Sequence, residues 1–209
     1  MTTTMNTINQ NLVSDPAVDA LFETALAASL KRQSDVAIPI LEQVLARNPC
    51  HARARHLLGA EFAQAGKMDD AVVEITTALE LNPDMPLARF QLGLMLMTCA
   101  RTEEAVQVWS GLDVLESCNV LNRFRRSMMM IVQGQMQLAH SELAAAIADN
   151  IDLPALNGEM REVIEMIASA NSPVTSSGNA EVDEVELNQD DPNAQHFLVS
   201  TYVQSPTIH

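Results

Sequence analysis

The sequence predicts an all-α protein built from antiparallel pairs of helices. The chain of 209 residues is 47% hydrophobic but only 3% aromatic, and this balance favours closely packed helices over a β-sandwich. Small residues also recur at one constant spacing, each near the start of a second amphipathic run: Ala37, Ala71, Ala105 and Ala139. Such a long, constant period indicates a solenoid, in which each helix pair buries its apolar face against the next.

Residues 58–83 contain the clearest helix pair. The Leu58-Gly59 step places a small residue where two helices must approach closely. Gly66 then breaks the first helix, and Pro83 ends the second. This pattern resembles the tetratricopeptide repeat (TPR), a unit of about 34 residues that folds as helix–turn–helix. The resemblance implies a right-handed superhelix of antiparallel helix pairs.

The same pattern divides most of the chain into four predicted TPR units within residues 15–153. The units cover residues 18–51, 52–85, 86–119 and 120–153. A bulky position follows each recurring alanine and holds Leu41, Ile75, Val108 beside Trp109, and Leu143. A further small or apolar position holds Val44, Ala78, Gly111 and Ala146. The turn position holds glycine in the second and fourth units only, and its occupants are Arg32, Gly66, Ala100 and Gly134.

Three segments flank the predicted units. Residues 1–14 are polar and are expected to be disordered. Residues 154–170 form an amphipathic run that predicts a helix capping the open end of the solenoid, with a swapped or dimer-forming helix as the alternative. Residues 171–209 contain six acidic residues and no lysine or arginine, which predicts an acidic disordered tail. Within that tail, residues 196–203 form a short apolar segment.

Charge and hydropathy exclude several classes of function. With 27 acidic and 12 basic residues, the net charge is −15, which disfavours binding to nucleic acid or to an anionic membrane. No run approaches the ~18 apolar residues that span a bilayer, and the first residues lack the features of a signal peptide. The cysteines lie far apart, as reduced thiols would: Cys50, Cys99 and Cys118. A cytoplasmic protein is therefore expected.

The sequence lacks a recognisable catalytic or metal-binding pattern. It contains no phosphate-binding glycine loop, nucleophile elbow or zinc motif, and its five histidines have no ligand-like spacing. Acidic pairs at positions 69–70 and 103–104 follow the repeat spacing, but each precedes a second helix, where the helix dipole favours acids. We therefore expect no enzyme activity, no cofactor and no metal.

The TPR resemblance implies that the first helix of each unit lines a concave face. Helical periodicity gives this face a groove that becomes more apolar toward the third and fourth units. The predicted groove residues are Phe22, Leu26, His56, Leu87, Phe90, Leu94, Met97, Leu121, Phe124, Met128 and Ile131. We interpret this surface as a site for a protein or peptide partner, with packing between helices as the alternative interpretation.

A basic rim beside this groove is a second hypothesis. Three arginines recur at the repeat spacing, and another follows the last of them: Arg55, Arg89, Arg123 and Arg126. The alternative is that they pair with acidic residues of neighbouring helices. The tail combines acidic residues with an apolar segment that holds Phe197, Leu198 and Tyr202. It is therefore a candidate to dock in the groove, either of the same molecule or of a neighbouring one.

Fold-level analogy favours a non-enzymatic adaptor that binds a peptide or protein partner in its concave groove. A secretion-type chaperone for an apolar client is one alternative, because small acidic all-TPR chaperones of bacterial type III secretion are similar in size and charge. A regulatory subunit of a separately encoded enzyme is another alternative. The resemblance also suggests a bacterial source.

Overall fold

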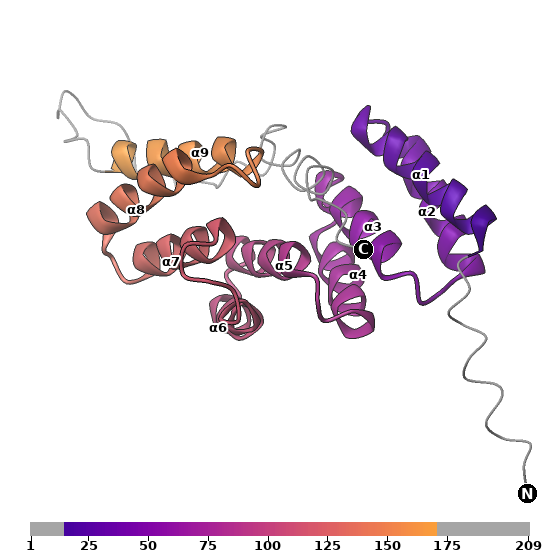
Figure 1. Ribbon diagram of the computed structural model, residues 1–209, viewed down its shortest axis with the longest axis horizontal. Coiled ribbons are helices and arrows are strands. Elements are labelled where there is room, and N and C mark those ends of the chain that lie inside the picture. Colours follow the sequence, from indigo (N-terminus) through magenta and orange to yellow (C-terminus); the bar gives the residue numbers. More distant parts are fainter. Residues whose placement is uncertain (1–14, 171–209) are drawn as a thin grey trace, which may run out of the picture.

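Helices account for all the regular structure of residues 15–170, the part of the chain that the computed structural model describes (Figure 1). The α-helices are α1 Pro16–Leu30, α2 Ser34–Arg47, α3 Ala52–Gln64, α4 Met68–Leu81, α5 Pro86–Thr98, α6 Thr102–Trp109, α7 Val120–Val132, α8 Met136–Asp149 and α9 Leu156–Ala170, and η2 is a short 3₁₀ helix, Ser110–Leu112. The predicted all-α class is confirmed. The predictions for residues 1–14 and 171–209, including Phe197, Leu198 and Tyr202, lie outside the described residues.

Consecutive helices pack as pairs joined by tight turns. α1 packs against α2, α3 against α4, α5 against α6, and α7 against α8. The pairs stack through contacts of α2 with α3, α4 with α5 and α5 with α7, and α9 packs against α8. The pairs follow one another along the long axis of the molecule, with α1 and α9 toward opposite ends (Figure 1). Each pair therefore buries its apolar faces mainly against its neighbours in the sequence.

The recurring small and bulky positions form the centre of each pair. The four alanines at the small position have no exposed surface. The bulky position holds Leu41, Ile75, Trp109 and Leu143, and the further small or apolar position holds Val44, Ala78, Leu112 and Ala146. All eight side chains are at most 1% exposed. The repeat spacing is thus unbroken in the third pair, which corrects the assignment of Val108 and Gly111 to these positions. Trp109 fills the interior, whereas Val108 is only half-buried and Gly111 lies under the guanidinium group of Arg89.

The turn inside each of these pairs has a left-handed backbone. Gly66 and Gly134 have φ angles of 73° and 74°. Arg32 and Ala100 occupy the same position without glycine and have φ angles of 58° and 57°. A residue with a Cβ atom is strained in this region by ~1–2 kcal/mol. The packing of the helices therefore imposes the turn conformation even where the sequence lacks glycine.

The third pair departs from the others in its second helix. α6 has 8 residues, whereas α2, α4 and α8 have 14 each. The chain continues through η2 and a loop of residues 113–119 before α7 begins. Asn119 caps α7, because its side-chain oxygen accepts a hydrogen bond of 3.0 Å from the backbone N–H of Leu121. The short helix and long loop leave a hollow beside the loop that joins α8 to α9.

The apolar core divides into two clusters. One comprises α1, α2 and α3 as far as Leu58, and the other extends from Ala60 to Ile167. Where they meet, the hydroxyl of Ser29 donates a hydrogen bond to the carboxylate of Glu61, and both residues are buried. The second carboxylate oxygen of Glu61 has no hydrogen-bond partner. The first helix pair therefore meets α3 through the apolar side chains of the smaller cluster and through this buried polar contact.

α9 covers the last helix pair. Leu156, Met160 and Ile167 are buried and belong to the larger cluster, while Met166 on the same helix is 65% exposed. The helix thus buries one apolar face, as a capping helix does at the end of a solenoid. Within residues 15–170, no helix combines the length and apolar character needed to cross a membrane.

Candidate functional site

The predicted groove residues fall into two groups by burial. Those of the first group are at most 8% exposed: Phe22, His56, Leu87, Phe90, Leu121 and Phe124. Those of the second group are half-buried: Leu26, Leu94, Met97, Met128 and Ile131. The first group offers little surface to a partner in this structure, whereas the second keeps part of its apolar surface available.

Ring contacts between successive helix pairs account for much of the first group. The ring of Phe90 on α5 lies 5.2 Å from that of Phe124 on α7. The ring of Phe22 on α1 lies 4.9 Å from the imidazole of His51, and the guanidinium group of Arg53 sits 4.7 Å from its centre. These aromatic side chains therefore pack between helices, which was the alternative interpretation for the predicted groove residues.

His56 links α3 to α5. Its imidazole is 2% exposed, and Nε2 lies 2.6 Å from Oε1 of Gln91. Because an amide oxygen only accepts hydrogen bonds, Nε2 carries the proton and donates it. Burial lowers the pKa of His56 from 6.5 to about 4, against the opposing effect of the hydrogen bond to Gln91. The ring is therefore neutral at neutral pH.

Two of the recurring arginines form equivalent ion pairs. Nη1 of Arg55 lies 2.8 Å from Glu74, and Nε of Arg123 lies 3.1 Å from Glu142. In both pairs the acid follows the arginine by 19 residues. Nη2 of Arg126 lies 2.5 Å from the same oxygen of Glu142. The charges of these three predicted rim residues are thus balanced within the protein, as the alternative interpretation of the arginines held.

Arg89 differs from its two equivalents. Its Nη2 donates to the backbone carbonyl of Pro83 at 3.0 Å, as Nε of Arg55 does to that of Pro49. The position equivalent to Glu74 in the third pair is Val108, which has no charge. The guanidinium group of Arg89 lies over Gly111 instead, where a Cβ atom would come within 2.6 Å of it.

The ion pairs of Arg123 shift the pKa values of Arg123 and Glu142. Burial alone would raise the pKa of Glu142, but hydrogen bonds from Arg126 and Arg123 outweigh burial and lower it. Burial alone would likewise lower the pKa of Arg123, but hydrogen bonds to Asp149, at 2.8 Å, and to Glu142 raise it. This cluster is therefore charged at neutral pH and joins α7 to α8.

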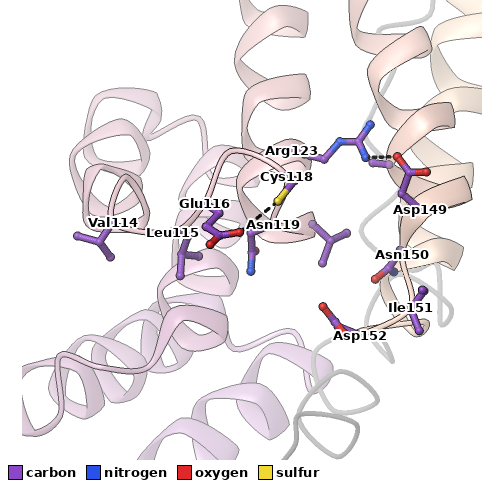
Figure 2. A pocket seen from close by; sticks show the side chains of 12 residues that line it. Val114, Leu115, Glu116, Cys118, Asn119, Arg123, Asp149, Asn150, Ile151 and Asp152 are labelled. Atoms are coloured by element: carbon purple, nitrogen blue, oxygen red, sulfur yellow. Dashed lines mark hydrogen bonds and ion pairs between the residues drawn. The ribbon is translucent and has the colours of Figure 1, made fainter.

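A pocket of about 350 Å³ lies between the loop after η2 and the loop that joins α8 to α9 (Figure 2). Glu116 and Asn119 lie on one side of it, and the side chains from the second loop lie on the other. Two aliphatic residues that line it, Val114 and Ile151, are 88% and 85% exposed, more than any other large hydrophobic residue within residues 15–170. This pocket was not predicted from the sequence, although Val114 and Ile151 are apolar residues in the loops that precede α7 and follow α8.

Residues 15–170 contain no group of three or more histidine, cysteine, aspartate or glutamate side chains placed to hold a metal ion. Cys50, Cys99 and Cys118 are free thiols, of which the first and last are exposed. The Sγ atom of Cys118 donates a weak hydrogen bond of 3.5 Å to Glu116 in the loop after η2. This thiol therefore lies within the lining of the pocket described above.

Comparison with known proteins identifies the fold. A scan against protein-family models and a search of curated proteins found no match. Among solved structures, a crystal structure of MamA protein aligns with 73% of this chain and 86% of its own, at a TM-score of 0.53 and 14% identity. The MamA RS-1 ArsTM double mutant aligns with 75% of this chain and 92% of its own, at a TM-score of 0.55 and 12% identity. The fold is of the tetratricopeptide-repeat type.

A third structure, MamA MSR-1 C2, agrees, with coverage of 74% of this chain and 92% of its own, a TM-score of 0.50 and 17% identity. At such identities the likeness concerns the fold alone. The TPR resemblance predicts that the first helix of each pair lines the concave face, and those helices here are α1, α3, α5 and α7. The recurring arginines Arg55, Arg89 and Arg123 bind backbone and carboxylate groups.

Proposed function

We propose that this protein is a non-enzymatic interaction scaffold that binds a protein or peptide partner on the concave surface of its TPR-type fold. The observation that carries the proposal is the partial exposure of apolar side chains on α5 and α7. Those side chains are Leu94, Met97, Met128 and Ile131. Apolar groups that remain partly exposed on neighbouring helices favour association with another apolar surface.

The methionines make this surface adaptable. Two of its four side chains, Met97 on α5 and Met128 on α7, are half-buried methionines. Unbranched thioether side chains change rotamer readily and fit irregular apolar partners. The buried contact between Phe90 and Phe124 holds α5 and α7 together, so the backbone that carries these side chains is already ordered before a partner binds.

The proposed partner is a protein of the cytoplasm. The net charge of −15 disfavours nucleic acid and anionic membranes as ligands. Arg55, Arg123 and Arg126 are already paired with acidic residues of the same chain. Apolar contact, and not a basic rim, would therefore supply most of the affinity.

A selection from a random peptide library tests this function. The full chain is immobilised, and the most enriched peptide is titrated against wild type and the double variant Leu94→Glu/Met128→Glu. Two charges placed in an apolar interface should weaken binding by about tenfold or more. The matched control Val73→Glu/Leu138→Glu places the same charges on second helices, where these residues are 61% and 57% exposed, and should bind as wild type does. Equal weakening in both variants would overturn the proposal.

Two alternatives would use the same surface. A secretion-type chaperone would hold a single apolar client, and a regulatory subunit would bind a separately encoded enzyme. A client that is insoluble alone but soluble in a stable complex with this chain would favour the chaperone. Exchange among short peptides of similar apolar character would favour the scaffold.

A further inference from the structure

The apolar surface proposed above as the binding site lies on two neighbouring helices. Leu94 and Met97 are about one turn apart on α5. Met128 and Ile131 are about one turn apart on α7. All four side chains are half-buried, and aromatic rings packed between α5 and α7 hold the two helices together. The chemistry of this surface therefore constrains the backbone conformation of a ligand that binds there.

The polar side chains of α5 and α7 already have hydrogen-bond partners within the chain. On α5, the side chain of Gln91 bonds to His56, and the hydroxyl of Thr98 donates to the backbone carbonyl of Met95. The other polar side chains of the two helices each form at least one hydrogen bond as well: Arg89, Asn122, Arg123, Arg125, Arg126 and Ser127. The two helices therefore offer mainly apolar side chains to a ligand.

The backbone of a bound peptide must also have its polar groups satisfied. In an extended peptide each residue presents an N–H and a C=O group that needs water or a partner. Groups that face the apolar side chains of α5 and α7 would lose water and gain no partner. Each such group would weaken binding by about fivefold or more. In an α-helix the backbone groups bond to one another, so an apolar stripe can be buried without this cost.

The charge of the protein selects among possible helical ligands. The chain has 27 acidic and 12 basic residues, which gives a net charge of −15. The arginines of α7 do not form an opposing basic patch, because Arg123, Arg125 and Arg126 are paired with carboxylates of the same chain. A helix that carries lysine or arginine beside its apolar stripe is therefore attracted to the protein, whereas an acidic helix is repelled.

We propose that the concave surface binds a basic, amphipathic α-helix of a partner protein. This inference rests on the proposed function and specifies its ligand. The apolar stripe of the bound helix, at positions i, i+3, i+4 and i+7, would pack on the four half-buried side chains of α5 and α7. Its lysine and arginine side chains would flank the stripe, with their charged ends in water.

Three acetylated and amidated peptides of about 18 residues test the inference on the full chain. The first has leucine at the helical spacing and lysine on the opposite face. The second has the same composition but leucine at every other position, which favours a strand. The third is the first with glutamate in place of lysine. The first should bind at least about tenfold more tightly than either of the others, and its ¹³Cα chemical shifts should become helical on binding.

Variants locate the bound helix. Leu94→Gln/Met128→Gln should weaken binding of the first peptide about fivefold or more, whereas the control Val73→Gln/Leu138→Gln on second helices should not. Glutamine is used because an added acid would itself attract lysine. Equal effects of the two double variants would overturn the placement of the helix on α5 and α7.

The comparison of peptides on wild type does not depend on how well a variant folds. Equal affinity for the first and second peptides would overturn the helical ligand, and equal affinity for the first and third would overturn its basic charge. If Leu94→Gln/Met128→Gln then weakened both peptides of an equal pair, the concave surface would still be a binding site and the proposed function would stand. No binding of the first peptide would also overturn the inference, while the peptide selection described above tests the proposed function separately.

Discussion

The indole N–H of Trp109 donates a hydrogen bond to the backbone carbonyl of Phe90 at 3.0 Å and ties the end of α6 to the middle of α5. The same indole lies against Gly93, where a Cβ atom would collide with Nε1 and the ring atoms beside it. The equivalent bulky positions in the other pairs hold leucine or isoleucine, which have no such donor. The large ring at 109 is thus matched to the absence of a side chain at 93.

Replacing Gly93 by alanine should lower the free energy of unfolding by ~1–3 kcal/mol in urea titrations, because the new Cβ atom would collide with a buried indole. The same change in a Trp109→Leu background should be neutral or should stabilise by up to ~1 kcal/mol. The smaller side chain leaves room, and alanine favours the helix more than glycine does. The same cost in both backgrounds would show that the ring is not the obstacle.

The turns at Arg32 and Ala100 are predicted to be sites of stored strain. Ala100→Gly, and separately Arg32→Gly, should raise the free energy of unfolding by ~1 kcal/mol, because both positions have a left-handed backbone. The corresponding rise in Tm is ~2–4 °C for a domain of this size. Gly134→Ala at the equivalent turn is the matched control and should lower stability. A loss of stability in Ala100→Gly would contradict this account of the turn.

Stability is predicted to decrease with acidity through His56. Its pKa is lowered from 6.5 to about 4 in the folded state, so the unfolded chain binds the proton first as pH falls. This contribution to stability is fully present above pH ~6.5 and is lost as pH falls toward ~4. Between pH ~7 and ~5 the free energy of unfolding should drop by ~2 kcal/mol.

The variant His56→Gln provides the control for that pH dependence. Glutamine preserves a donor for Gln91 but does not titrate, so the ~2 kcal/mol drop should disappear. Chemical denaturation of both proteins at several pH values measures the difference. An identical pH dependence in wild type and variant would assign the effect to other groups.

The acidic tail is predicted to cover the concave surface. Removal of residues 180–209, which include Phe197, Leu198 and Tyr202, should raise the binding of an apolar fluorescent dye. It should also raise the affinity for peptides selected on the concave surface, because an intramolecular competitor is lost. Unchanged dye binding and unchanged peptide affinity would together refute docking of the tail.

The repeat period predicted the scaffold well because it reports packing directly. Every recurring alanine is fully buried, and the left-handed turns fall at the predicted positions even at Arg32 and Ala100. The prediction at Val108 and Gly111 was wrong because each of them lies one residue before the position that the repeat spacing gives. The strict repeat spacing predicts Trp109 and Leu112 as the buried residues at these two positions.

The candidate surfaces were harder to predict, since the exposure of their residues depends on how the helix pairs stack. Periodicity assigns Phe90 and Met97 to one side of α5, but it does not reveal that Phe124 covers Phe90 while Met97 stays half-exposed. The partner of Arg55 is Glu74 on the neighbouring helix, and that contact follows from the pairing of α3 with α4. The pocket results from the early end of α6 at Trp109. Gly111, which follows closely and replaces the non-glycine residues of the other pairs, is the local signal for that end.

Site-specific photo-crosslinking in the cells that make this protein tests the central claim most directly. A benzophenone side chain is introduced at Met97 or Met128 on the concave surface, and at Leu138, which is 57% exposed on α8, as the control. The account predicts a discrete protein adduct from each of the first two positions, lost when an excess of the selected peptide competes, and none from position 138. Adducts of equal yield from position 138, or none from positions 97 and 128, would contradict it.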